Sequence, residues 1–96
     1  MRLSDQQVQI IRALVREGLG SEARVCVFGS RVDETATGGD IDLLIELPEK
    51  AALAREIALS ARLEQQLGRP VDVLTTWPGQ RERPIVEIAR LTGVPL

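Results

Sequence analysis

Residues 40–47, which read DIDLLIEL, constrain the fold more than any other stretch of this 96-residue chain. Side chains alternate between the two faces of a β-strand, so a strand here places four apolar residues on one face. These are Ile41, Leu43, Ile45 and Leu47. Asp40 and Asp42 then lie side by side on the opposite face, at the start of the strand. The segment therefore predicts a sheet that is packed on one face and partly open on the other.

Three helices and two further strands are predicted around this strand. Ser4 and Gln7 resemble a capping box, which marks the start of the first helix. The predicted helices cover residues 4–19, 49–67 and 83–91, and the predicted strands cover residues 24–28, 40–47 and 71–75. The short link between the first two strands and the helical crossover before the third predict one α/β domain over residues 1–96. We expect a small mixed sheet with helices packed on one face, while residues 93–96 give no clear signal.

The composition excludes several kinds of site. The chain has no histidine, which rules out a Ser-His-Asp triad and argues against a zinc site. Its one cysteine, Cys26, lies in an apolar run and is interpreted as a small buried side chain rather than a nucleophile. Aromatic residues make up 2% and the net charge is −2, which argues against direct binding of nucleic acid. Catalysis would therefore rest on carboxylates, hydroxyls, arginines and a hard metal ion.

Three aspartates are candidate metal ligands. Asp40 and Asp42 share one strand face, and two like charges that close favour a cation between them. Asp72 interrupts the apolar run PVDVL and faces the same side if the two strands are neighbours. Carboxylates on one open face suit Mg²⁺, and three of them can hold the two ions used in phosphoryl transfer. Other interpretations stay open: Asp40 as a turn residue or helix cap, and Asp72 as a solvent-facing residue of an edge strand. Glu46, at the far end of the same face, is interpreted as solvated.

Gly29 and Ser30 directly follow the first predicted strand. Glycine allows a ligand to approach the backbone closely, and serine offers a hydroxyl and, at a helix start, free N–H groups for an anion. Arg31 lies where a phosphate would bind, although a plain surface role also fits it. A lone Gly-Ser is a weak signal, and it gains weight here from the aspartates that follow it.

The combination of GS at residues 29–30, DID at residues 40–42 and VDV around Asp72 resembles the nucleotidyltransferase superfamily that includes DNA polymerase β. The chain looks most like the minimal nucleotidyltransferases of bacteria and archaea, which are commonly encoded beside a HEPN-domain protein in toxin–antitoxin pairs. The closing segment RERPIVEIARLTGVPL is also similar to the ends of these domains. The resemblance covers nearly the whole chain.

The resemblance implies a fold, a reaction and a partner. Gly29 and Ser30 would hold the triphosphate of ATP, Asp40 and Asp42 would bind Mg²⁺, and Asp72 would complete the metal site and help to activate the attacking hydroxyl. The chain would transfer AMP to a tyrosine of a HEPN toxin, an RNase, and so silence it as its antitoxin in a hetero-oligomer. Two alternatives remain: an antitoxin that neutralises by binding alone, and a nucleotidyltransferase that acts on a small molecule.

Some features of the chain stay open. Gly39 stands where relatives often have Ser or Thr, and Asp33 and Glu34 make the loop before it acidic. Trp77 could stack on adenine or pack structurally. The sequence contains no secretory leader and no apolar run long enough for a membrane span, so a cytoplasmic protein is expected.

Overall fold

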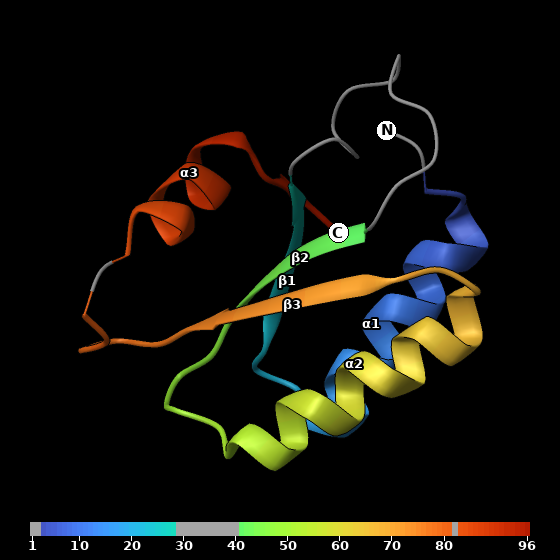
Figure 1. The fold of residues 1–96 in the computed structure, drawn as a ribbon, viewed down its shortest axis with the longest axis horizontal. Helices are drawn as coiled ribbons and strands as arrows, with labels where there is room; N and C mark the ends of the chain where they lie inside the picture. The colour runs from blue at the N-terminus through green and yellow to red at the C-terminus, as the bar shows by residue number, and fades with distance from the viewer. Residues whose placement is uncertain (1–2, 29–40, 82) are drawn as a thin grey trace.

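The computed structural model describes residues 3–28, 41–81 and 83–96, which form three helices and four strands (Figure 1). In chain order these are α1 (Asp5–Leu19), β1 (Arg24–Phe28), β2 (Ile41–Glu46), α2 (Leu53–Leu67), β3 (Val71–Thr76), α3 (Pro84–Thr92) and β4 (Val94–Pro95). No helix of the described part is long and apolar enough to cross a membrane.

The four strands form one mixed sheet in the order β3-β2-β1-β4. β1 and β2 pair antiparallel across their short link, and β2 and β3 pair parallel across α2, as the connection lengths predict. β4 pairs antiparallel with the outer edge of β1, with Val94 opposite Val27. The sequence did not reveal β4, because two residues are too few to show an alternating pattern.

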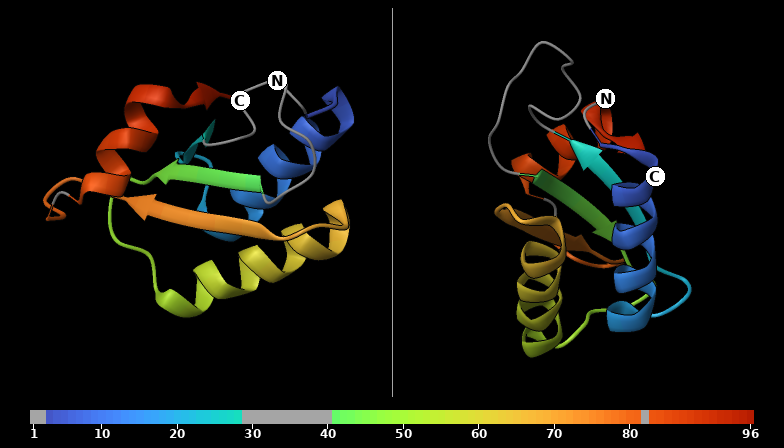
Figure 2. Two further views of the ribbon diagram at one scale, coloured as in Figure 1. Left: turned by 45° about the horizontal axis from the view of Figure 1, so that its top comes forward. Right: turned by 90° about the vertical axis from the view of Figure 1, so that its right-hand side faces the viewer.

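The two long helices cover one face of the sheet and enclose the main core with it (Figure 2). The apolar residues predicted to face this core are buried, and Ile41, Leu43 and Ile45 are completely so. The mixed α/β fold is therefore confirmed, and its packed face is the expected one.

The expectation that all helices share one face is wrong for α3. This helix packs against the other face, where Val86 and Ala89 meet Phe28 and Leu44 in a second, smaller cluster. The physical reason is Leu44, which follows Leu43 and so points to the face of the aspartates. An apolar side chain there needs a cover, and α3 supplies it over part of that face only.

The helix starts differ in how well local sequence predicts them. The capping box of α1 is confirmed, since the Ser4 hydroxyl accepts from the Gln7 amide at 3.1 Å and the Gln7 side chain accepts from the Ser4 amide at 2.9 Å. α2 begins at Leu53 rather than at residue 49. The chain uses residues 47–52 to pass from the end of β2 to the face that α2 covers.

Candidate active site

Two of the three predicted metal ligands are paired across neighbouring strands. In the parallel register of β2 and β3, Asp42 lies opposite Asp72. Neighbouring strands are about 4.8 Å apart, and residues in register point to the same face. Asp42 is half-buried and Asp72 is exposed, whereas Val71 beside it is buried in the main core. The two carboxylates therefore lie side by side on the face away from α1 and α2.

The face that carries these aspartates is organised in three rows that cross the sheet. The first row is Phe28, Asp42 and Asp72, the second is Cys26, Leu44 and Leu74, and the third is Arg24, Glu46 and Thr76. α3 packs over Leu44 in the second row and over Phe28 at the β1 end of the first. The helix thus leaves the aspartate end of the first row uncovered.

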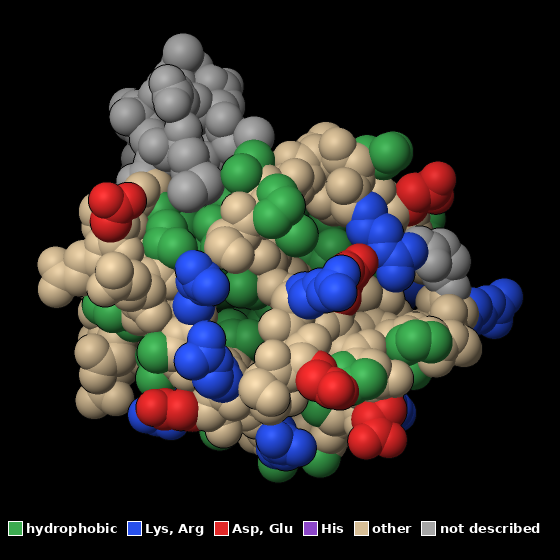
Figure 3. Space-filling model, turned by 180° about the vertical axis from the view of Figure 1, so that it is seen from behind, with side chains coloured by type: hydrophobic (Ala, Val, Ile, Leu, Met, Phe, Trp, Pro, Cys, Tyr) green, Lys and Arg blue, Asp and Glu red, His purple; other side chains and the backbone are tan. Residues whose placement is uncertain are grey.

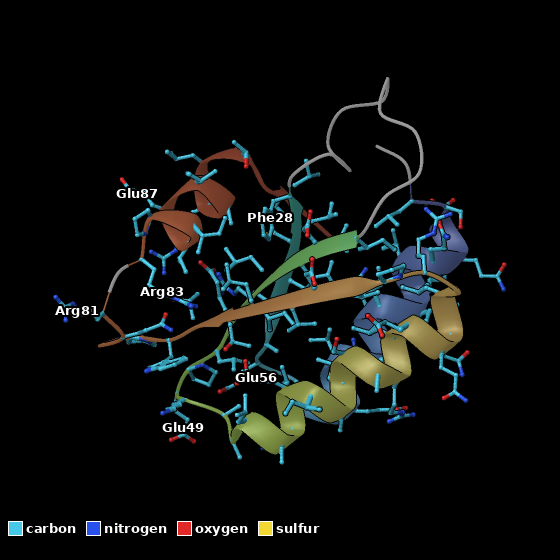
Figure 4. The ribbon with its side chains drawn as sticks, in the orientation of Figure 1. Phe28, Glu49, Glu56, Arg81, Arg83 and Glu87 are labelled. Carbon is cyan, nitrogen blue, oxygen red and sulfur yellow. The ribbon has the colours of Figure 1, made fainter. Side chains whose placement is uncertain are left out.

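An open hollow of about 480 Å³ lies at this uncovered end. Its lining comprises Phe28, Asp42, Asp72, Val73, Leu74, Ile85, Ile88 and Thr92. Phe28 is the last residue of β1, and its side chain lies on the side of α3 (Figure 4). The hollow therefore has two carboxylates among apolar residues on its sheet side, and two isoleucines and a threonine along its α3 side.

Contacts from α2 hold β3, and with it Asp72, in place. The Glu64 carboxylate accepts from the Val71 amide at 2.9 Å, and the Ser60 hydroxyl donates to the Val71 carbonyl at 2.9 Å. Further along β3, the Thr75 hydroxyl donates to Glu56 at 2.6 Å. These bonds join α2 to both ends of β3, so the position of Asp72 follows from the packing of the helix.

The remaining predicted site residues lie outside the described part of the chain. These are Gly29, Ser30, Arg31 and Asp40, together with Asp33, Glu34 and Gly39 of the same segment. Within residues 3–28, 41–81 and 83–96 there is no group of three His, Cys, Asp or Glu side chains placed to hold a metal ion. The described pair, Asp42 and Asp72, nevertheless fits Mg²⁺ by its chemistry, because both are hard oxygen donors on one open face.

Glu46 is not simply solvated, so that prediction is wrong. Its carboxylate accepts from the Nε of Arg90 at 3.3 Å, and the Nη2 of Arg90 also donates to the Thr76 hydroxyl at 3.2 Å. A single strand pattern could not reveal this pair, because Arg90 comes from α3, far along the chain. The contact ties α3 to the third row and so helps to set where the hollow opens.

Cys26 and Trp77 take no part in the carboxylate site. Cys26 lies in the second row, where burial, and to a smaller extent the negative charge of Glu46, raises the pKa of its thiol. A raised pKa disfavours the reactive thiolate, in line with the interpretation as a non-nucleophilic residue. Trp77 lies outside the hollow and has the Lys50 ammonium 5.8 Å from its ring centroid, which favours the packing role.

Sequence reasoning missed the α3 wall of the hollow. In this helix Ala89 is buried, whereas Ile85 and Ile88 are exposed. The sequence does contain a sign of this second apolar strip. Val86 and Ala89 are three residues apart, and so are Ile85 and Ile88, so the helix has two apolar pairs at helical spacing. One strip holds the helix to the sheet and the other faces the hollow.

A second hollow, of about 420 Å³, lies at the sheet edge formed by β1 and β4. Its lining includes Arg12, Arg16 and Arg24, but neither Asp42 nor Asp72. The face seen in Figure 3 shows basic side chains around a depression with apolar side chains at its floor. This second hollow lacks the paired carboxylates, so the hollow beside α3 that contains Asp42 and Asp72 is the candidate active site.

Comparisons with known proteins show the family and the fold of the chain. The family model for the nucleotidyltransferase domain matches residues 8–91. A protein of Methanocaldococcus jannaschii that is named as a protein adenylyltransferase is 36% identical over 76 residues, which are 78% of each chain.

Solved structures show the same fold at low sequence identity. A toxin–antitoxin crystal structure with AMP-PNP gives a TM-score of 0.78 at 17% identity and covers 97% of this chain and 72% of that one. The MntA-HepT toxin–antitoxin gives 0.75 at 15% identity, covering 96% and 70%. A tri-AMPylated Shewanella oneidensis HEPN toxin in complex with its MNT antitoxin gives 0.71 at 18% identity, covering 93% and 66%. By its family match and its fold, the chain belongs to the nucleotidyltransferase domain family.

Proposed function

We propose that the chain is a Mg²⁺-dependent protein adenylyltransferase, the antitoxin of a HEPN toxin, and that it transfers AMP from ATP to a tyrosine of that toxin. The observation that carries the proposal is the register of β2 and β3, which pairs Asp42 with Asp72 on an open face of the sheet. Support for the nucleotide and the partner comes from the relatives, which include an adenylyltransferase and the antitoxin bound to an AMPylated HEPN toxin. We place the reaction in the cytoplasm, where ATP and the RNA substrate of the toxin are found.

The chain's residues would divide the work as follows. Asp40 and Asp42 would hold Mg²⁺ with Asp72, and Gly29, Ser30 and Arg31 would hold the triphosphate. Bound Mg²⁺ supplies positive charge that offsets the charge of the phosphate oxygens.

In the reaction, the tyrosine oxygen forms a bond to the α-phosphorus of ATP, and the bond from that phosphorus to the pyrophosphate oxygen breaks. Asp72, which is exposed at the edge of the sheet, accepts the phenolic proton. AMP remains on the tyrosine, and pyrophosphate leaves.

The test is AMP transfer to the purified HEPN protein with ATP and Mg²⁺, measured by intact-protein mass spectrometry. Asp72→Asn is expected to lower the rate by about 10²–10⁴-fold, because it removes the proton acceptor. Glu22→Gln is the matched control: it removes one negative charge from an exposed turn before β1, and the rate should be unchanged.

Other results would point elsewhere. A HEPN protein that is inhibited without gaining AMP would replace this proposal with neutralisation by binding alone. Transfer of AMP to a small acceptor without any partner protein would assign the chain to small-molecule modification. Full activity in Asp72→Asn would refute the assigned role of the paired carboxylates.

A further inference from the structure

α3 carries two apolar strips, and only one of them is used by the fold. Val86 and Ala89 are buried against the sheet. Ile85, Ile88 and Leu91 follow one another at a spacing of three residues and are 46%, 54% and 80% exposed. Most surface helices turn polar side chains outward, and a cluster of large exposed apolar residues marks an interaction surface. The second strip of this nine-residue helix therefore takes no part in the cluster that attaches α3 to the sheet.

The exposed strip is continuous with the candidate active site. Ile85 and Ile88, with Thr92 at the end of the helix, form the helix side of the hollow that holds Asp42 and Asp72. Leu91 lies about one helical turn further on, outside the hollow. From Ile85 to Leu91 the strip spans about 9 Å along the helix axis, at about 1.5 Å per residue. Apolar surface thus leads from solvent directly to the paired carboxylates.

We propose that this strip, Ile85, Ile88 and Leu91, is the docking surface for the protein that carries the acceptor tyrosine. Ile85 and Ile88 pack against the acceptor ring, and Leu91 contacts an apolar side chain next to it. The hollow is amphipathic in the way that a phenol requires: the hydroxyl meets carboxylates, and the ring meets isoleucine side chains. A tyrosine of a folded protein that reaches Asp72 brings its surroundings close to the hollow, and Ile85 and Ile88 lie on the helix side of that hollow.

The adenine base is the competing occupant of the strip. A base could pack on Ile85 or Ile88, but one held in the hollow would leave Leu91 uncovered, and Leu91 is the most exposed of the three. A protein surface covers all three residues at once. The length of the strip therefore favours a protein partner.

The identity of the partner rests on the proposed function, so the experiment measures binding and chemistry separately. Ile88→Ala is compared with Ile57→Ala, which makes the same change at a 61% exposed isoleucine of α2, the helix on the opposite face of the sheet. Alanine is a strong helix former, so both variants should keep their helices. Ile88→Leu serves as the conservative rescue. For each protein, calorimetry gives the affinity for the HEPN protein and for ATP, and a steady-state assay gives KM and kcat for AMP transfer.

We expect Ile88→Ala to weaken binding of the HEPN protein about tenfold, the usual effect of truncating an apolar anchor at an interface. KM for the HEPN protein should rise by a similar factor, with ATP affinity unchanged. Ile57→Ala should match the wild type, and Ile88→Leu should recover most of the affinity. Leu91→Ala should weaken binding of the whole HEPN protein but not the modification of a short tyrosine peptide.

Each contrary outcome overturns the docking surface, the proposed function or both. If Ile88→Ala behaves like Ile57→Ala while AMP is still transferred, the docking surface is wrong and the proposed function stands. If ATP affinity falls and partner affinity does not, the strip belongs to the base and the docking surface is again wrong. If the HEPN protein binds through the strip but gains no AMP, the docking surface stands and the proposed chemistry fails. A HEPN protein that neither binds nor is modified overturns both.

Discussion

Leu44→Ala should release α3 from the sheet before the rest of the domain unfolds. Leu44 is 1% exposed and lies at the centre of a cluster with Phe28, Val86 and Ala89, which is the main apolar attachment of α3. The change removes three buried carbons, at about 0.8 kcal/mol each, and leaves a cavity besides. The expected loss is therefore about 3 kcal/mol, within the usual range of about 2–5 kcal/mol for leucine to alanine in a core. Most of this loss falls on α3.

The assay uses two signals along one urea titration. Trp77 is the only tryptophan of the sequence and belongs to the segment that connects β3 to α3 along the chain. Its fluorescence should therefore report on the attachment of α3. Far-UV circular dichroism reports mainly on α1 and α2, which have 15 residues each against nine in α3. In Leu44→Ala the fluorescence midpoint should fall by about 1–3 M urea, at an m-value of about 1–3 kcal/mol per M. The circular-dichroism midpoint should fall less, because α1 and α2 do not depend on this cluster.

The neighbouring residue provides the control. Leu43 is completely buried but points to the other face, into the core beneath α1 and α2. Leu43→Ala should therefore lower both midpoints together, as expected when one cooperative unit loses stability. Coincident midpoints in Leu44→Ala would refute the reasoning, since they would mean that α3 and the main core unfold as one unit.

Three further predictions test other parts of the structure. Ser4→Ala removes the acceptor of the Gln7 amide and should cost about 1 kcal/mol, lowering the melting temperature by about 4–8 °C in a thermal scan. Cys26 should react slowly with iodoacetamide near neutral pH, because burial and Glu46 raise the pKa of its thiol. The pKa of this thiol is therefore higher in the folded protein than in the unfolded chain. The contribution of the neutral thiol to the free energy of unfolding is fully present below the unfolded-state pKa, and it is lost as the pH rises through the folded-state pKa. Cys26→Ser should therefore reduce the alkaline loss of stability, and an unchanged alkaline loss would contradict this origin. Glu46→Gln weakens the exposed pair with Arg90 and should cost at most about 1 kcal/mol in urea unfolding; a larger loss would mean that the pair is a main anchor of α3.

Local patterns were enough to predict the sheet face on which Asp42 and Asp72 lie. The alternation in residues 40–47 defined a strand with one apolar face, so Asp42 could be placed on the opposite face before any tertiary contact was known. The same rule placed Asp72, because Val71 and Val73 flank it. The capping box predicted the start of α1 for a similar reason: Ser4 and Gln7 are three residues apart and meet within one turn.

Contacts between distant segments decided the rest. The pairing of Asp42 with Asp72 depends on the register of two strands joined through α2, which hydrogen bonds from Glu64 and Ser60 to β3 help to set. The position of α3 depends on Leu44, whose apolar side chain points to the face of the aspartates and is covered by a helix that begins 40 residues later in the chain. The residue pattern of each strand was sufficient to show which face carries carboxylates and which carries apolar side chains, because such patterns repeat over two to four residues. Which carboxylates meet, and where the face stays open, depends on the packed fold, because burial is shared between segments far apart in the chain.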